Sequence, residues 1–252
     1  MSKMLFKRLA RSLWRTKLRL VAVIVMIAVG MTAGISFGIY AKSATTLLET
    51  VYQDTEDGVN LPDLWVDNNA SVWTPEETAA LCQGISDTWP NASMPLKTCE
   101  PRLIQDGLLI QKKKDSDEEK LVASVWHGIG KGETHRVWMP DHPTVEGRLA
   151  RSDTEIVIDA HAAEGIKAEQ DPDFEILGST VQISAGAGVL PFEVVGIGYH
   201  ADHLYFAPEG SILPAKDGTF VTGYLTEAGL ARLTDRPPGS SNFLLLDIQG
   251  EP

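Results

Sequence analysis

The sequence predicts an α+β domain carried on one N-terminal transmembrane helix. An uncharged apolar run occupies residues 20–41, and about 210 residues with short strand and helix patterns follow it. Some 20 helical residues cover the roughly 30 Å hydrocarbon core of a bilayer. Because no water reaches backbone groups inside that layer, a helix is the structure expected for a single span. Strands interleaved with short helices in the remainder indicate the α+β class.

The residues before the apolar run predict its orientation. They include no acidic residue and seven basic ones, which are Lys3, Lys7, Arg8, Arg11, Arg15, Lys17 and Arg19. A basic flank stays on the cytoplasmic side of the cell (inner) membrane. We therefore expect a cytoplasmic segment at 1–19, a transmembrane helix at 20–41, a helical stalk at 42–60 and an extracytoplasmic domain at 61–252. A cleaved signal peptide is the alternative, although its apolar region usually has only about 7–15 residues.

Leucine spacing in the cytoplasmic segment predicts a helix that lies along the membrane surface. Leu5, Leu9 and Leu13 recur every four residues, with Trp14 beside them and basic residues on the other faces. Such an amphipathic helix binds lipid headgroups, where tryptophan is favoured. A plain basic flank that only fixes orientation would explain the charges but not this spacing.

Glycines repeat within the predicted span. Gly30, Gly34 and Gly38 lie four residues apart, so they share one face of a helix. Stripes of small residues let a second membrane helix approach closely. We expect this face to pack against another membrane helix.

The charge of the outer portion limits its partners. After Lys42 the chain has 14 basic residues against 34 acidic ones, a net charge near −20. This sign disfavours nucleic acid, which binds basic surfaces. It also disfavours a surface lying flat on anionic lipid.

Two cysteines, Cys82 and Cys99, lie in the predicted external domain. In an oxidising compartment such a pair usually forms a disulfide, and two buried thiols are the alternative.

Local patterns predict the elements of the domain. Thr74-Pro75-Glu76-Glu77 has the residues of a capped helix start, and that helix should run to about Ser86. A hairpin is expected from residues 101–111 and 119–129 around a charged tip at 112–120. The other strands are expected at 63–67, 155–159, 180–184, 192–197, 220–225 and 243–248, and two more helices at 160–167 and 226–233.

No catalytic or cofactor motif stands out. The histidines are His127, His135, His142, His161, His200 and His203, and only His200, Asp202 and His203 are close enough in sequence to suggest metal ligands. Gly128–Gly132 lacks the spacing of a phosphate-binding loop, and no Gly-x-Ser-x-Gly turn presents a nucleophile. We expect a protein that is not an enzyme and needs no cofactor.

The order of these features resembles the permease subunits of the MacB/FtsX-like (lipoprotein-releasing-type) ABC transporters. Glu146-Gly147-Arg148 followed by Glu155–Asp159 is similar to the family's "eGr … eivl" passage. Leu177–Val181 is similar to its "lGdtv", with Ser179 in place of aspartate, and Phe192–Ile197 to its "f.VvGi". The segment Ala201–Ala207 resembles the one that follows.

The resemblance implies a MacB-like periplasmic core domain in a non-catalytic permease subunit. Such subunits pair with a cytoplasmic ABC ATPase and usually with a second permease, and they couple ATP hydrolysis to the external domain. Family members add three further spans after this domain, so we expect the chain to be a fragment of a longer permease. The alternative is a single-span, membrane-anchored binding module without an ATPase partner.

Overall fold

The computed structural model describes residues 2–51, 62–68, 70–90, 94–112, 118–130, 146–170, 174–198, 215–216 and 218–248. The chain divides into two compact units, residues 1–51 and residues 52–252. Each unit is described by itself below.

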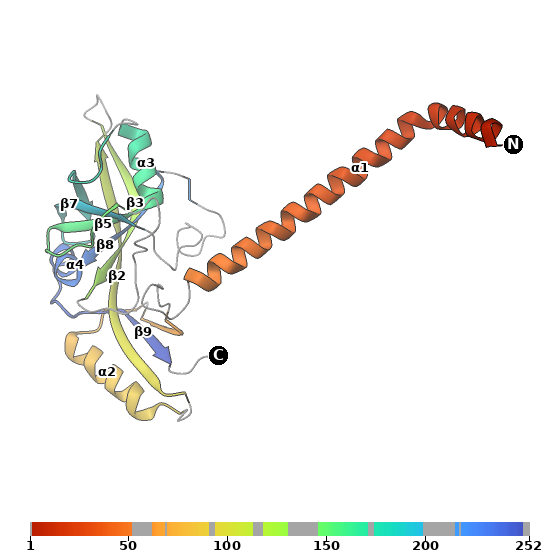
Figure 1. Cartoon of the computed structure of the whole chain (residues 1–252). Helices are drawn as coiled ribbons and strands as arrows, with labels where there is room; N and C mark the ends of the chain where they lie inside the picture. The colour runs from red at the N-terminus through yellow and green to blue at the C-terminus, as the bar shows by residue number, and fades with distance from the viewer. Residues whose placement is uncertain are drawn as a thin grey trace. The chain divides into compact units, whose positions relative to one another are not determined.

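The first unit is a single helix, α1 (Ser2–Val51), drawn from red to orange in Figure 1. Its most apolar part, Val21–Ser43, has 23 residues with a mean hydropathy of 2.2, and none of it is buried within the protein. At 1.5 Å per residue this part is about 35 Å long, enough to cross a bilayer. The helix is continuous through residues 20 and 41, where the sequence predicted boundaries between segments. The rest of the predicted stalk, residues 52–60, lies outside the described residues.

The second unit contains nine strands and three helices in its described parts. In chain order these are β1 (Leu64–Asp67), α2 (Pro75–Thr88), β2 (Leu96–Lys112), β3 (Glu119–Ile129), β4 (Glu146–Gly147), β5 (Glu155–Asp159), α3 (Ala160–Gln170), β6 (Thr180–Ser184), β7 (Val189–Gly198), β8 (Phe220–Thr226), α4 (Glu227–Thr234) and β9 (Phe243–Ile248).

Six strands close into a ring. The antiparallel pairs are β2 with β3, β8 with β5, β7 with β6 and β6 with β2. The parallel pairs are β3 with β8 and β5 with β7. Each strand therefore has two neighbours, and the ring has no free edge. The short strand β4 pairs with Gly196 and Ile197, near the end of β7.

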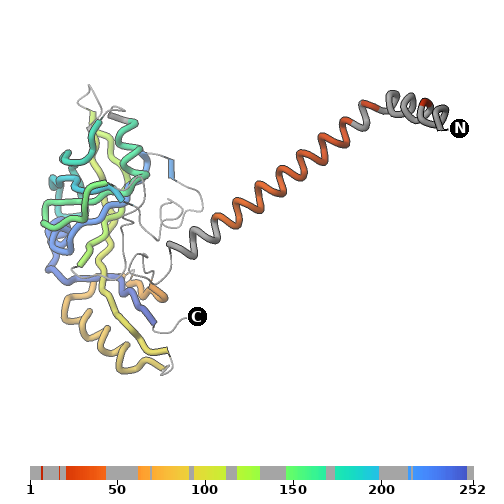
Figure 2. The backbone as a smooth tube through the Cα atoms, viewed as in Figure 1, coloured from red at the N-terminus to blue at the C-terminus, as the bar shows by residue number. Residues whose placement is uncertain are grey.

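The strand β2 is longer than the sequence predicted, because its two halves belong to different sheets. Residues 103–112 pair with β3 in the ring, whereas residues 96–102 pair with β9, and β9 pairs in turn with β1. Figures 1 and 2 show β2 running from the region of α2 and β9 into the region of β3, β5 and β8. The expected start at residue 101 was wrong, since pairing with a distant strand extends β2 through Pro101 to Leu96.

Trp126 lies at the centre of the ring and is completely buried. Its indole N–H donates to the backbone oxygen of Ser184, at 3.2 Å. Two glycines leave room for the indole side chain. A Cβ on Gly107 of β2 or on Gly223 of β8 would lie under 3.0 Å from it. The surrounding side chains are apolar and buried, and include Leu109, Val122, Ile156, Ile158, Ile183, Phe192, Val194, Val221 and Leu225.

The predicted helices and strands are present, with small changes in length. The capping box at Thr74 forms as expected, with the Glu77 carboxylate accepting from Thr74 N–H at 2.8 Å. The strand expected at 192–197 begins at Val189, because the 180–184 strand continues its hairpin pairing to that residue. The sequence patterns do not predict the two-residue strand β4. The described domain combines helices with a sheet of mixed parallel and antiparallel strands.

Candidate functional site

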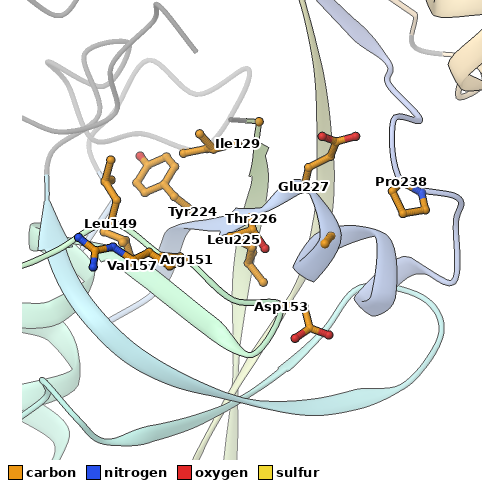
Figure 3. Close-up of a pocket in the computed structure, with 13 residues that line it drawn as sticks. Ile129, Leu149, Arg151, Asp153, Val157, Tyr224, Leu225, Thr226, Glu227 and Pro238 are labelled. Carbon is orange, nitrogen blue, oxygen red and sulfur yellow. The ribbon is translucent and has the colours of Figure 1, made fainter. Parts of the chain in front are cut away.

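A pocket of about 840 Å³ lies on the outer side of the ring, beside α4. Pockets that bind small molecules usually have volumes of about 300–1,000 Å³. Figure 3 shows the lining side chains around the end of β8. The lining residues are Ile129, Gly130, Leu149, Ala150, Arg151, Asp153, Val157, Tyr224, Leu225, Thr226, Glu227, Ala228 and Pro238.

The base of this pocket is a small apolar cluster separate from the core of the ring. Side chains alternate between the two faces of a strand, so Ile156 and Leu225 point into the ring while Val157 and Tyr224 point outward. Val157 and Tyr224 are paired across β5 and β8, and both are buried. Ile129, Ala150 and Val195 pack against them. The pocket base is therefore built on four strands, β3, β5, β7 and β8.

One wall is the loop 148–154, which an ion pair closes. Gly147 has φ +81°, and a Cβ there would lie 2.3 Å from the backbone oxygen of Val195, so this position requires glycine. The next residue, Arg148, donates two hydrogen bonds to the Glu155 carboxylate, at 2.7 and 2.8 Å. Glu155 also accepts from the Arg151 backbone N–H at 2.8 Å. The Glu146-Gly147-Arg148 … Glu155 passage is thus a loop-closing unit that shapes this wall.

These contacts change the acidity of Glu155. The bidentate bond from Arg148, with the Arg151 backbone N–H, lowers the pKa of Glu155 to about 2. Hydrogen bonds to an ionised carboxylate favour the charged form, which explains the direction. The loop is therefore closed by a charged pair throughout the physiological pH range.

The other wall is the first turn of α4. The Thr226 hydroxyl caps this helix by accepting from Gly229 N–H at 3.0 Å, and it donates to Ser152 of the loop at 3.2 Å. Arg232 of α4 donates to the backbone oxygen of Asp153 at 2.8 and 3.1 Å. It also lies 4.9 Å above the Phe192 ring. Loop and helix are therefore fixed to each other, and the two walls form one unit.

The pocket rim has three charged side chains. Asp153 pairs with Arg232 at 3.6 Å. Among the described residues, the Arg151 guanidinium and the Glu227 carboxylate have no hydrogen-bond or ion-pair partner. The lining set contains no histidine, cysteine or serine. Apolar walls with two available charges are suited to holding an amphipathic molecule.

The glycine stripe lies on an open helix face. A Cβ at Gly30, Gly34 or Gly38 would meet nothing within 4 Å, so the described part of the chain places no helix against it. Leu5, Leu9, Leu13 and Trp14 lie within α1, but their side chains are outside the described set. The predicted lipid contacts and helix packing stay predictions.

The two cysteines are joined in the structure. The Sγ atoms of Cys82 and Cys99 are 1.98 Å apart, and the Cα atoms 5.8 Å. This disulfide connects α2 to the first half of β2. Cys99 lies in the part of β2 that pairs with β9, and neither cysteine lines the pocket.

The histidines considered as metal ligands do not come together in the described structure. His127 is buried in β3 with its ring 5.3 Å from that of Tyr224. His161 bonds Asp159 through Nδ1 at 2.9 Å. His135, His142, His200 and His203 lie outside the described residues, as does Asp202. Within the described residues no group of three or more histidine, cysteine or acidic side chains could hold a metal ion.

Sequence reasoning did not identify the pocket. Its residues come from the end of β3, the loop 148–154, β5, β8, α4 and the turn at Pro238, which are far apart in the chain. Sequence patterns place Val157 in the 155–159 strand and Glu227 in the 226–233 helix, but they do not bring these elements together in one site. Gly128, considered for a phosphate loop, is a residue of β3 against Leu230.

Solved structures that resemble the chain include two permease domains. No protein-family model matches the chain, and no curated protein matches it. The extracellular domain of the noncanonic ABC-type transporter YknZ from Gram-positive bacteria is similar at 14% identity, with a TM-score of 0.37 over 72% of this chain and 76% of that one. A domain of a candidate permease protein from Porphyromonas gingivalis is similar at 12% identity, with a TM-score of 0.31 over 68% of this chain and 62% of that one.

Proposed function

We propose that this chain is a permease subunit, or part of one, of an ABC transporter of the MacB/FtsX/Lol type. In this role it couples ATP hydrolysis in the cytoplasm to an extracytoplasmic domain. The single observation that carries the proposal is the continuity of α1. A basic segment, a 23-residue apolar span and a further helical segment at 44–51 form one unbroken helix from Ser2 to Val51.

A continuous helix is suited to transmitting movement across a bilayer. Fifty helical residues extend about 75 Å, which exceeds the roughly 30 Å hydrocarbon layer by several turns. A tether that only anchors a domain needs no ordered helix beyond the span. In the proposed role, displacement of the cytoplasmic end moves the outer end as well, because the backbone hydrogen bonds are unbroken between them.

The family-like passages support the proposed identity through what they build. Gly147, Arg148 and Glu155 close the loop 148–154. Gly178 has φ +77°, and its N–H donates to the backbone oxygen of Val194 at 2.8 Å. Both passages therefore fasten connections to β7. Motif residues that also fix the backbone are stronger support for the proposed family than a match between apolar strands alone.

The proposal includes specific partners. The chain is taken to be non-catalytic and to work with a separate cytoplasmic ABC ATPase. A second permease subunit would pack on the Gly30, Gly34, Gly38 face, where a neighbouring helix can approach closely. The domain after Lys42 would be extracytoplasmic, and Leu5, Leu9, Leu13 and Trp14 would seat the N-terminal segment on the inner lipid surface.

Copurification tests this role. The full-length gene product, tagged at its C-terminus, is purified from its native membrane in mild detergent, and its partners are identified by mass spectrometry. We expect a protein with a Walker-type nucleotide-binding motif in about stoichiometric amount. A matched variant with Pro at Leu9 should lose the ATPase, because proline interrupts the N-terminal helix. Membranes that yield the tagged chain without any ATPase would contradict the proposal.

One observation favours the alternative of an anchored binding module. The pocket beside α4 has the size and apolar character of a ligand site, and its use needs no ATPase. Purification of the chain alone, with a ligand retained by the domain, would favour this alternative.

A further inference from the structure

We propose that the pocket beside α4 binds an amphipathic organic cation, with its apolar body on the pocket wall and its charged end at Glu227. This inference goes beyond the proposed transport role, because binding at this site requires neither an ATPase nor a membrane potential.

The apolar part of the ligand has a defined place. Val157 and Tyr224 form a base that is already buried, so the accessible apolar wall comes from residues around it. Leu149 is 43% exposed although it lies within the pocket, and Ile129, Ala228 and Pro238 extend the same wall. When a ligand covers an exposed leucine in a concave site, apolar surface is removed from water and the complex is stabilised.

The charge of the ligand follows from the side chains at the rim. Arg232 already neutralises Asp153. Of the two available groups, Arg151 is exposed to solvent, whereas Glu227 is half-buried on the first turn of α4. A charge that is partly shielded from water interacts more strongly with a bound ion than an exposed one does. The carboxylate is therefore the stronger recognition group.

The field of the whole domain acts in the same direction. With 14 basic and 34 acidic residues after Lys42, the domain carries a net charge near −20. Such a field raises the local concentration of cations and lowers that of anions. Pocket and domain thus both favour a positively charged ligand with an apolar body.

A matched series of probes tests the proposal. The probes are 4-phenylbutylamine, 4-phenylbutanol and 4-phenylbutyrate, which share one apolar body and differ in charge. Binding to the full chain in lipid nanodiscs is measured by saturation-transfer NMR, with empty nanodiscs subtracted. We expect the amine to bind at least tenfold more tightly than the butyrate at low salt, with the alcohol between them.

Two variants assign the binding to this pocket. Ala228→Trp fills the pocket from an exposed position on α4, and it should abolish the amine signal without affecting folding. Glu227→Gln should weaken the amine about threefold and leave the alcohol unchanged. Glu164→Gln is the matched control, since this exposed carboxylate on α3 is outside the pocket and should have no effect.

Three results would each contradict a different part of the proposal. Tighter binding of the butyrate would make Arg151 the recognition group and refute the cation. Amine binding that survives Ala228→Trp would place the site elsewhere, and no binding of any probe would remove the site. None of these results bears on whether an ATPase copurifies with the chain.

Discussion

At the scale of single residues, two glycines determine whether the ring can close around Trp126. The indole lies between Gly107 of β2 and Gly223 of β8, strands that are not neighbours in the ring. It also donates to Ser184 of β6. Trp126 therefore contacts β2, β6 and β8, and its indole fits only because β2 and β8 have glycine at the contact positions.

A methyl group at Gly223 should destabilise the domain. Its Cβ would lie 2.6 Å from Trp126 Cζ3 and 3.0 Å from Ile156 Cδ1, both in buried side chains. We expect Gly223→Ala to lower the free energy of unfolding by about 2 kcal/mol, measured by denaturant titration with tryptophan fluorescence. Gly84→Ala is the matched control, because it lies in α2 with nothing within 4 Å and should raise stability by up to about 1 kcal/mol. Equal effects of the two changes would contradict this packing.

The Glu155 carboxylate should make stability depend on acid pH. The pKa of Glu155 is lowered to about 2 by Arg148, so the folded-state value lies below that of an unfolded chain. The ionised form therefore stabilises the fold above pH 5, and this contribution is lost as the pH falls from about 5 toward 2. We expect Glu155→Gln to cost about 1 kcal/mol at pH 7, a modest value because Arg148 is 40% exposed.

The control for this prediction is another glutamate. Glu175→Gln removes an exposed carboxylate that has no ion pair among the described residues, so its pH dependence should match that of the parent chain. The measurement is the free energy of unfolding between pH 7 and pH 3. The prediction fails if Glu155→Gln and the parent chain lose stability in parallel over this range.

At the scale of elements, α2 depends on few contacts. Thr78 is its one buried residue, and its hydroxyl lies 2.8 Å from that of Ser241. The disulfide from Cys82 to Cys99 is the covalent connection between this helix and β2. Most of the helix surface is exposed, so packing alone gives it little stability.

Loss of the disulfide should therefore release α2 before the ring. Replacing Cys82 and Cys99 by serine should lower stability by about 2–4 kcal/mol, the usual value for a loop of this length. Hydrogen exchange should accelerate more in residues 75–88 than in β3, β5 and β8. Mass spectrometry after thiol alkylation checks that the parent chain contains the bond. Two alkylated thiols in the purified protein would instead support the alternative of unpaired cysteines.

At the scale of the whole molecule, the basic residues before Val21 predict which side the domain occupies. An N-terminal tag should be protected from protease in sealed, right-side-out cells, and a tag after the domain should be removed. The physical reason is the cost of moving seven positive charges across the bilayer. Inverted vesicles are the control and should give the opposite pattern. Protection of the outer tag in intact cells would reverse the orientation and contradict the proposed function.

The sequence by itself determined the local features of this protein. Val21–Ser43 is apolar enough to span a membrane because hydropathy depends on composition alone. The capping box at Thr74 and the hairpin of β2 and β3 form as predicted, because their partners are three residues apart or in strands that are close in sequence.

Only the tertiary structure decided how these pieces combine. The ring requires β3 to pair with β8 and β2 with β6, and β2 to divide its length between β3 and β9. The pocket requires the loop 148–154 to meet α4, about 75 residues further along the chain. Such contacts depend on which apolar faces cover one another. Side-chain periodicity shows that a strand has a buried face, but not which distant segment will bury it.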